Sequence, residues 1–194
     1  QSSTIGRFGR ILIGLGLIMF ALQWISVAAK PVVQAAGVKV IFASLTGDVL
    51  LDMLVAALFT VLCYSSLAVV LLVATLASLH VIALPVALGL VLGANLGSGL
   101  LGMLSTLRAT PEARRVTLGN FLFKLIGCLL AYPLVGHLES WIAGMELDPS
   151  REVVLFHLFF NVALALLLVF WTERIARVAE RMLPARPASE DPAK

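Results

Sequence analysis

Residues Met53 to Leu107 read "MLVAALFTVLCYSSLAVVLLVATLASLHVIALPVALGLVLGANLGSGLLGMLSTL" and contain no aspartate, glutamate, lysine or arginine. One membrane-spanning helix needs about 20 apolar residues, so this run is long enough for more than one membrane segment. The whole chain shares this character, because 60% of its 194 residues are hydrophobic and only 13% are charged. Soluble domains have about a quarter charged residues. The sequence therefore predicts an all-α, polytopic membrane protein.

The arginines flank the apolar segments and form no separate basic domain. They cluster in residues 7–10, 108–115 and 174–186. This is the pattern of cytoplasmic loops under the positive-inside rule, and it places both ends of the chain in the cytoplasm. The net charge of +3 therefore indicates no nucleic-acid partner. Cys63 and Cys128 both lie in apolar segments, so we expect no disulfide framework, resident metal or cofactor, and no grouping suggests an enzyme.

We expect residues 1–174 to form one membrane transport unit. Its predicted segments are a span at about 8–28, a re-entrant hairpin at 50–79, a broken span at 81–107, and spans at 116–135 and 153–171. Each hairpin arm would be about 20 Å long, too short for a hydrocarbon core of about 30 Å. The arginine clusters also fall on one side only if the hairpin makes no net crossing. Residues 175–194 are expected to form a basic amphipathic helix and a disordered tail that begin a cytoplasmic region.

Polar and small residues interrupt the most apolar part of the chain at two places. The first is the predicted hairpin turn, and the second is "GANLGSG" at residues 93–99. Each glycine weakens a helix by roughly 1 kcal/mol relative to alanine, and broken helices are typical of transporter sites. Small residues in membrane helices also serve plain helix packing, but the two stretches together favour a substrate or ion site. The candidate residues are Tyr64, Ser65, Ser66, Gly93, Asn95, Gly97 and Ser98.

These stretches resemble the bacterial type II sodium/phosphate cotransporters. "YSSLA" (64–68) and "GANLGSG" (93–99) are similar to that family's "QSSSA" hairpin and "GANIGTT" segment. "IGLGLIMFALQWIS" (13–26), "ARRVTLGNFLFKLIG" (113–127) and "LFHLFFNV" (155–162) resemble further family segments in the family's order. The similarity covers nearly the whole chain, and "GANLGSGLLGML" resembles the branch that carries a cytoplasmic PhoU-like tail.

The resemblance implies a sodium-coupled transporter of inorganic phosphate in the bacterial inner (plasma) membrane, working in the direction of efflux. Family members have two inverted repeats that hold phosphate and sodium between two hairpins, and this chain resembles the second repeat only. It implies that a preceding N-terminal repeat or a second copy completes the site, that a PhoU-like domain follows, and that sodium contacts Ser65, Ser66 and Asn95. Tyr64 and Leu67 replace the motif's glutamine and third serine, so fewer sodium ligands are expected from this half.

Four further polar residues in predicted spans, and one at the hairpin entrance, have two interpretations each. Lys124, where the family has asparagine, either pairs with phosphate as a point charge or extends to the inner interface. Asn120 lies one turn earlier on the same face and shares either role. His157 and Asn161 are spaced i, i+4, which favours an interhelical hydrogen bond over a proton or ion role. Asp52 either helps to attract sodium or caps the descending arm of the hairpin.

The sequence also allows two other functions. One is transport of a different oxyanion on the same scaffold. The other is a non-transporting membrane subunit that docks a cytoplasmic regulator through the basic helix of residues 174–186, an interpretation that the loss of the motif glutamine at Tyr64 favours.

Overall fold

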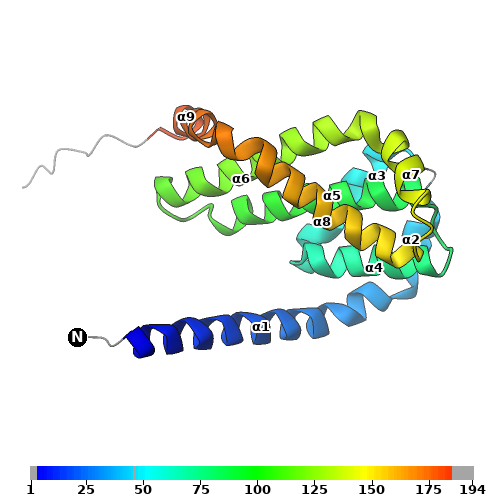
Figure 1. Cartoon of the computed structure of the whole chain (residues 1–194), viewed down its shortest axis with the longest axis horizontal. Coiled ribbons are helices and arrows are strands. Elements are labelled where there is room, and N and C mark those ends of the chain that lie inside the picture. Colours follow the sequence, from blue (N-terminus) through cyan, green and yellow to red (C-terminus); the bar gives the residue numbers. More distant parts are fainter. Residues whose placement is uncertain (1–3, 46, 185–194) are drawn as a thin grey trace, which may run out of the picture.

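A computed structural model describes residues 4–45 and 47–184, and every regular element in these ranges is a helix (Figure 1). The elements are α1 (Thr4–Gln34), α2 (Ala36–Ala43), α3 (Val49–Cys63), α4 (Ser66–Ser78), α5 (Leu84–Ser105), α6 (Pro111–Ala131), η1 (Tyr132–Leu134), α7 (Val135–Ala143), α8 (Pro149–Leu168), η2 (Val169–Trp171) and α9 (Thr172–Met182). The all-α prediction is confirmed. The predicted tail beyond residue 184 lies outside the described residues.

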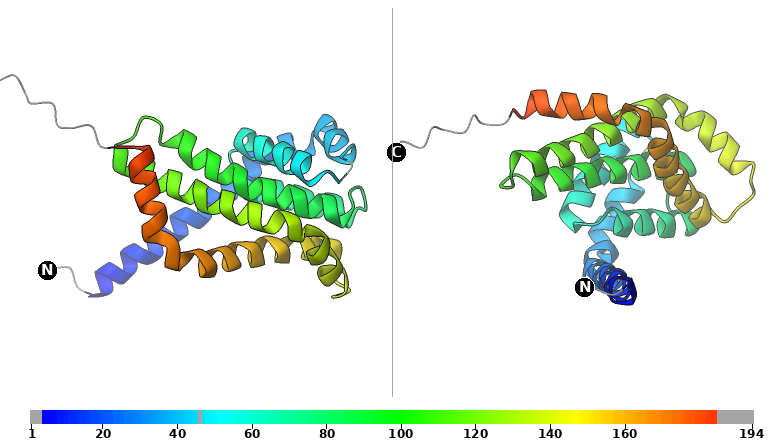
Figure 2. Two further views of the ribbon diagram at one scale, coloured as in Figure 1. Left: turned by 90° about the horizontal axis from the view of Figure 1, so that it is seen from above. Right: turned by 60° about the vertical axis from the view of Figure 1, so that its left-hand side comes forward.

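Three described helical stretches are long and apolar enough to cross a membrane. They are Leu84–Ser105, Pro111–Ile142 and Pro149–Met182. The last of these bends at η2, where α9 turns away from the axis of α8 (Figure 2). These stretches support the prediction of a polytopic membrane protein.

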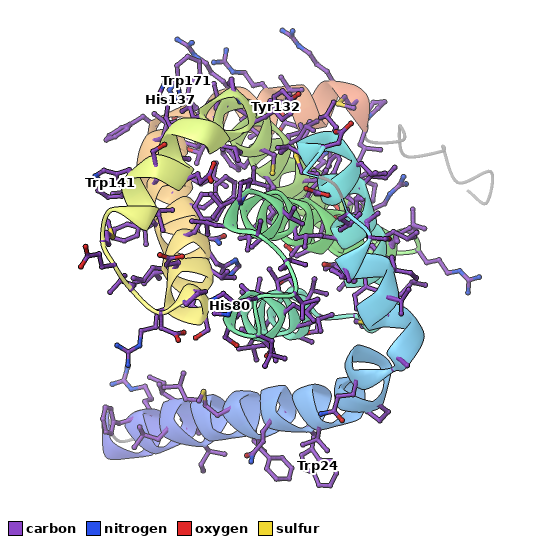
Figure 3. All side chains as sticks on the ribbon, turned by 90° about the vertical axis from the view of Figure 1, so that its right-hand side faces the viewer. Trp24, His80, Tyr132, His137, Trp141 and Trp171 are labelled. Atoms are coloured by element: carbon purple, nitrogen blue, oxygen red, sulfur yellow. The ribbon has the colours of Figure 1, made fainter. Side chains whose placement is uncertain are left out.

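Helix α1 contains the first predicted span and lies beside the bundle, where it meets α4 (Figure 3). Its Trp24 points away from the other helices and is 60% exposed. With 31 residues, α1 is about 46 Å long, longer than the hydrocarbon core. Whether it crosses the membrane stays a prediction.

Helices α3 and α4 form the predicted helical hairpin. The predicted bounds of 50–79 agree with the start of α3 and the end of α4 to within one residue. Tyr64 makes the turn in a left-handed conformation (φ 57°), and Ser65 caps α4 by accepting a hydrogen bond from the Ala68 N–H at 3.1 Å. Insertion of this hairpin from one side of the membrane remains a prediction.

The predicted break in the following span was wrong, because α5 is a continuous helix through residues 93–99. Gly89, Gly93 and Gly97 are spaced four residues apart and therefore lie on one face of the helix. That face packs directly on the α3 backbone: a Cβ atom at Gly93 would lie 2.2 Å from the Met53 carbonyl oxygen. A Cβ at Gly97 would lie 2.6 Å from the carbonyl oxygen of Ala57. The close contact with α3 compensates for the low helix propensity of glycine.

Helix α5 is the centre of the bundle. Helices α3, α4, α6, α7 and α8 all pack against it (Figure 2). Its side chains from Ala87 to Leu92 are buried in the apolar core. The fold therefore places α5 between the hairpin and the α6–α8 helices, and residues on its different faces meet different neighbours.

Candidate functional site

Helices α5, α6 and α8 bring five polar side chains together within otherwise apolar surroundings. We call this group the polar cluster; it consists of Asn95, Ser98, Lys124, His157 and Asn161. Asn95 is only 1% exposed, and the other four are partly buried. Polar groups at such depth in a membrane protein are costly unless they find partners, and they mark candidate functional sites.

Asn95 is the central member of the polar cluster. Its side-chain Nδ2 donates to the Val91 carbonyl oxygen at 3.0 Å and lies 3.2 Å from Nδ1 of His157. Its Oδ1 accepts a hydrogen bond from Asn161 Nδ2 at 3.0 Å. Because Asn95 Nδ2 is the donor, His157 Nδ1 is the acceptor, which puts the imidazole proton on Nε2. The interpretation of His157 and Asn161 as partners in interhelical hydrogen bonding is confirmed.

Lys124 extends the polar cluster to α6. Its ammonium donates to the hydroxyl of Ser98, which in turn donates to the Asn95 carbonyl oxygen at 2.7 Å. The ammonium therefore points at α5 and does not extend along α6 to the interface, which removes the second interpretation of this lysine. No carboxylate of the described residues forms an ion pair with Lys124. Its positive charge is thus available to an anionic ligand.

Among the described residues, the remaining polar candidates make no hydrogen bond to the polar cluster. The side chain of Tyr64 is 64% exposed, and Ser65 and Ser66 are partly buried at the start of α4. In the described part of the chain, no hydrogen bond joins either serine to Asn95 or Ser98. Asn120 is exposed on α6.

The glycines of the candidate list serve packing in this arrangement. Gly93 and Gly97 are covered by α3, as the close approach to Met53 and Ala57 shows. Contacts at successive glycines also show that α3 runs in the same direction as α5, because Gly97 meets Thr60 whereas Gly89 meets Asp52. The hairpin turn therefore lies beyond Gly97, towards the C-terminal end of α5.

Two buried polar residues lie on α3, and of these the sequence reasoning considered Asp52 but missed Thr60. Asp52 and Thr60 are fully buried, and their side-chain oxygens have no hydrogen-bond partner among the described residues. They face α5 at Gly89 and Gly97 respectively. The four-residue glycine spacing of α5 indicates a closely packed neighbouring helix but does not say which one, so it does not single out Thr60.

Polar contacts fix two positions outside the core of the bundle. Arg115 Nε donates to the Leu183 carbonyl oxygen at 2.9 Å and ties the end of α9 to the start of α6. Asp148 caps α8, and hydrogen bonds from the side chain and the backbone N–H of Ser150 hold the pKa of this carboxyl below its usual value. The first contact joins α9 to α6, whereas the second is local to the start of α8.

Comparison with known proteins gives a consistent set of relatives. The family model described as "Na+/Pi-cotransporter" matches residues 30–147. A Salmonella typhimurium protein named "Putative inorganic phosphate export protein YjbB" is 50% identical over 187 residues, which is 96% of this chain and 34% of that protein. Its Escherichia coli K12 namesake is 48% identical over the same shares. "Uncharacterized protein YqeW" of Bacillus subtilis is 23% identical over 93% of this chain and 59% of its own length.

The chain spans about a third of the length of the two YjbB proteins. No solved structure matches it.

Proposed function

Because the chain belongs to the Na+/Pi-cotransporter family, we propose that it acts in the transport of inorganic phosphate across a membrane, as part of a secondary transporter. The observation that carries this proposal is the polar cluster, in which the Lys124 ammonium lies between membrane helices and has no carboxylate partner among the described residues. A phosphate anion would supply the negative charge that balances this ammonium. The proposal assigns no chemical reaction to the chain.

We propose that the substrate-binding surface of this half is built from two parts. The hairpin turn contributes Ser65 and Ser66 together with the free N–H groups at the start of α4, which favour an anion. The polar cluster contributes Ser98 and Lys124. Asn95 has both N–H groups engaged, so its available group is the second lone pair of Oδ1, which suits a cation better than phosphate.

Sodium coupling and export are the finer parts of the proposal. The description of the family supports sodium as the coupling ion, and the names of the two YjbB proteins support export. We further propose the bacterial plasma membrane as the location, with both ends of the chain in the cytoplasm. Since the chain spans a third of those relatives, a preceding repeat or a second copy is proposed to complete the site, and a PhoU-like domain to follow.

Radioactive phosphate flux in proteoliposomes tests the proposal. The purified protein is compared with the double variant Ser65→Ala, Ser66→Ala and with Ser105→Ala as the matched control. Ser105 is exposed and bonds only within its own helix, to the Leu101 carbonyl oxygen. We expect the double variant to lose flux and the control to keep it. Unchanged flux in the double variant would remove the hairpin turn from the site.

A non-transporting role is favoured by one observation. Helix α9 is fixed to α6 through Arg115 and carries arginines on an exposed face, as a docking element for a cytoplasmic regulator would. A protein that shows no phosphate flux but retains a soluble partner through α9 would support this second function.

A further inference from the structure

Asp52 is a buried acidic residue for which the described residues provide no partner. Its side chain is 0% exposed, and neither carboxylate oxygen has a hydrogen-bond partner among the described residues. It faces α5 at Gly89, where a Cβ atom would lie 3.2 Å from its Oδ2. Burying an unpaired carboxylate is strongly unfavourable, so the group has to be neutralised in this arrangement.

Helix capping does not explain Asp52, because another residue performs that role. Asp48 is the N-cap of α3, and its Oδ1 accepts hydrogen bonds from the N–H groups of Leu50 at 3.0 Å and Leu51 at 3.2 Å. Asp52 lies one turn later and bonds to none of the N–H groups of its own helix. Of the two interpretations that the sequence allows for Asp52, capping is therefore excluded.

Among the described residues, the helices packed on α3 offer no protein cation to Asp52. Helices α4 and α5 contain no ionisable side chain, and the charged group that faces Asp52 along its own chain is the carboxylate of Asp48. Helix α2 carries Lys39, whose side chain lies outside the described residues. Gly89 lies beyond the first turn of α5, so its N–H already donates within the helix. The α5 backbone at this position therefore offers Asp52 no hydrogen-bond donor.

We propose that Asp52 binds a monovalent cation, a sodium ion or a proton, at the contact between α3 and α5. One positive charge neutralises one carboxylate, whereas a divalent ion would leave a net charge in the bundle. The described residues also hold no group of three His, Cys, Asp or Glu side chains that suits a transition metal. This inference rests on the proposed function, because it names a residue for the coupling ion.

Asp52 is fully buried where α3 packs on Gly89, so a cation at Asp52 exchanges only when this contact between α3 and α5 opens. Binding is thereby linked to the position of the hairpin. Such a link is what a transporter needs to couple an ion gradient to the exposure of its site.

Sodium binding to the purified protein tests the proposal without any phosphate. Radioactive sodium is titrated in detergent against wild type, Asp52→Asn and the matched control Asp48→Asn, which keeps a good N-cap residue. We expect Asp52→Asn to weaken binding about tenfold or more and Asp48→Asn to leave it unchanged. Acidic buffer should suppress wild-type binding, because protons compete for the same carboxylate.

A second measurement tests whether the cation at Asp52 is a proton. In sodium-free buffer, the thermal unfolding temperature of wild type should fall as the pH rises, because deprotonation leaves a buried charge, while Asp52→Asn should lose this dependence. Asp52→Asn is close to isosteric and removes a charge, so we expect it to fold, and Asp52→Ser serves as a second neutral variant.

Variants that match wild type both in sodium binding and in pH dependence would overturn the proposal. Neither measurement contains phosphate. A protein that binds the cation but shows no phosphate flux would therefore count against the proposed function alone.

Discussion

Replacing Gly93 with alanine should separate α3 from α5. The added Cβ atom would lie 2.2 Å from the carbonyl oxygen, 2.7 Å from the Cα and 2.8 Å from the carbonyl carbon of Met53. All three are backbone atoms, so no change of rotamer relieves the overlap. Helix α3 would have to move by roughly 1 Å before these contacts become ordinary.

The expected cost follows from two opposing effects. Overpacking of this kind costs about 1–3 kcal/mol, and a backbone clash belongs at the upper end. Alanine regains roughly 1 kcal/mol of helix propensity over glycine. We therefore expect Gly93→Ala to be less stable than wild type by about 2 kcal/mol, a decrease of roughly 4–8 °C in the thermal unfolding temperature for a chain of this size.

Other glycines of α5 provide a graded control series in the same assay, thermal unfolding of the purified protein in detergent. A Cβ atom at Gly102 would meet only the Thr117 side chain, at 3.8 Å, so Gly102→Ala should be neutral or stabilising by up to about 1 kcal/mol. At Gly89 the nearest atom is Asp52 Cβ at 3.0 Å, which predicts an intermediate effect. If Gly93→Ala proved as stable as Gly102→Ala, the close packing of α3 on α5 would be wrong.

Three further predictions concern single residues. Asn161→Ala removes the donor to Asn95 Oδ1 and should destabilise the protein by about 1–2 kcal/mol in thermal unfolding; no change would mean that this hydrogen bond is not formed. Lys124→Met keeps the apolar stem but removes the ammonium, and it should lower phosphate flux roughly tenfold or more while Lys124→Arg retains part of it; equal loss in both would point to shape rather than charge. Tyr64→Gly relieves the left-handed turn at φ 57° and should raise stability by about 1 kcal/mol, whereas a decrease would show that the tyrosine side chain makes a necessary contact.

The hairpin could be predicted from the sequence because two local features indicate it. Its arms are too short to span the membrane, and the serines that separate them are good helix N-caps. Ser65 does cap α4. These signals are local, so they survive without knowledge of the neighbouring helices, and the predicted ends agree with the observed ones.

The continuity of α5 could not be predicted from the same kind of signal. Gly93 and Gly97 lower helix propensity whatever their context, and this local effect suggested a break. What keeps the helix intact is the contact that their lack of a side chain allows with Met53 and Ala57. The spacing of four residues was visible in the sequence, but it does not say which helix packs on the glycine face.

Only part of the polar cluster could be predicted from the sequence, for a similar reason. The i, i+4 spacing of His157 and Asn161 placed them on one helical face and indicated an interhelical partner. That partner, Asn95, is separated from them by more than 60 residues of sequence. Likewise, the sequence left two directions open for Lys124, and only the packing of α6 on α5 selects the one towards Ser98.

The two sides of α5 differ in the kind of contact that holds them. Towards α6 and α8, Lys124 and Asn161 donate hydrogen bonds to α5 and His157 accepts one from it, which ties three helices to one another. Towards α3, the contact is made by glycines, and it buries two polar groups, Asp52 and Thr60, that have no hydrogen-bond partner in the described part of the chain. Each unsatisfied buried group costs about 1–3 kcal/mol, so these two groups offset part of the stabilisation that the close packing of α3 on α5 provides. An unbroken α5 also leaves no unwound segment to bend. Motion in this half of a transporter is therefore expected between α3 and α5, while hydrogen bonds hold α5, α6 and α8 together.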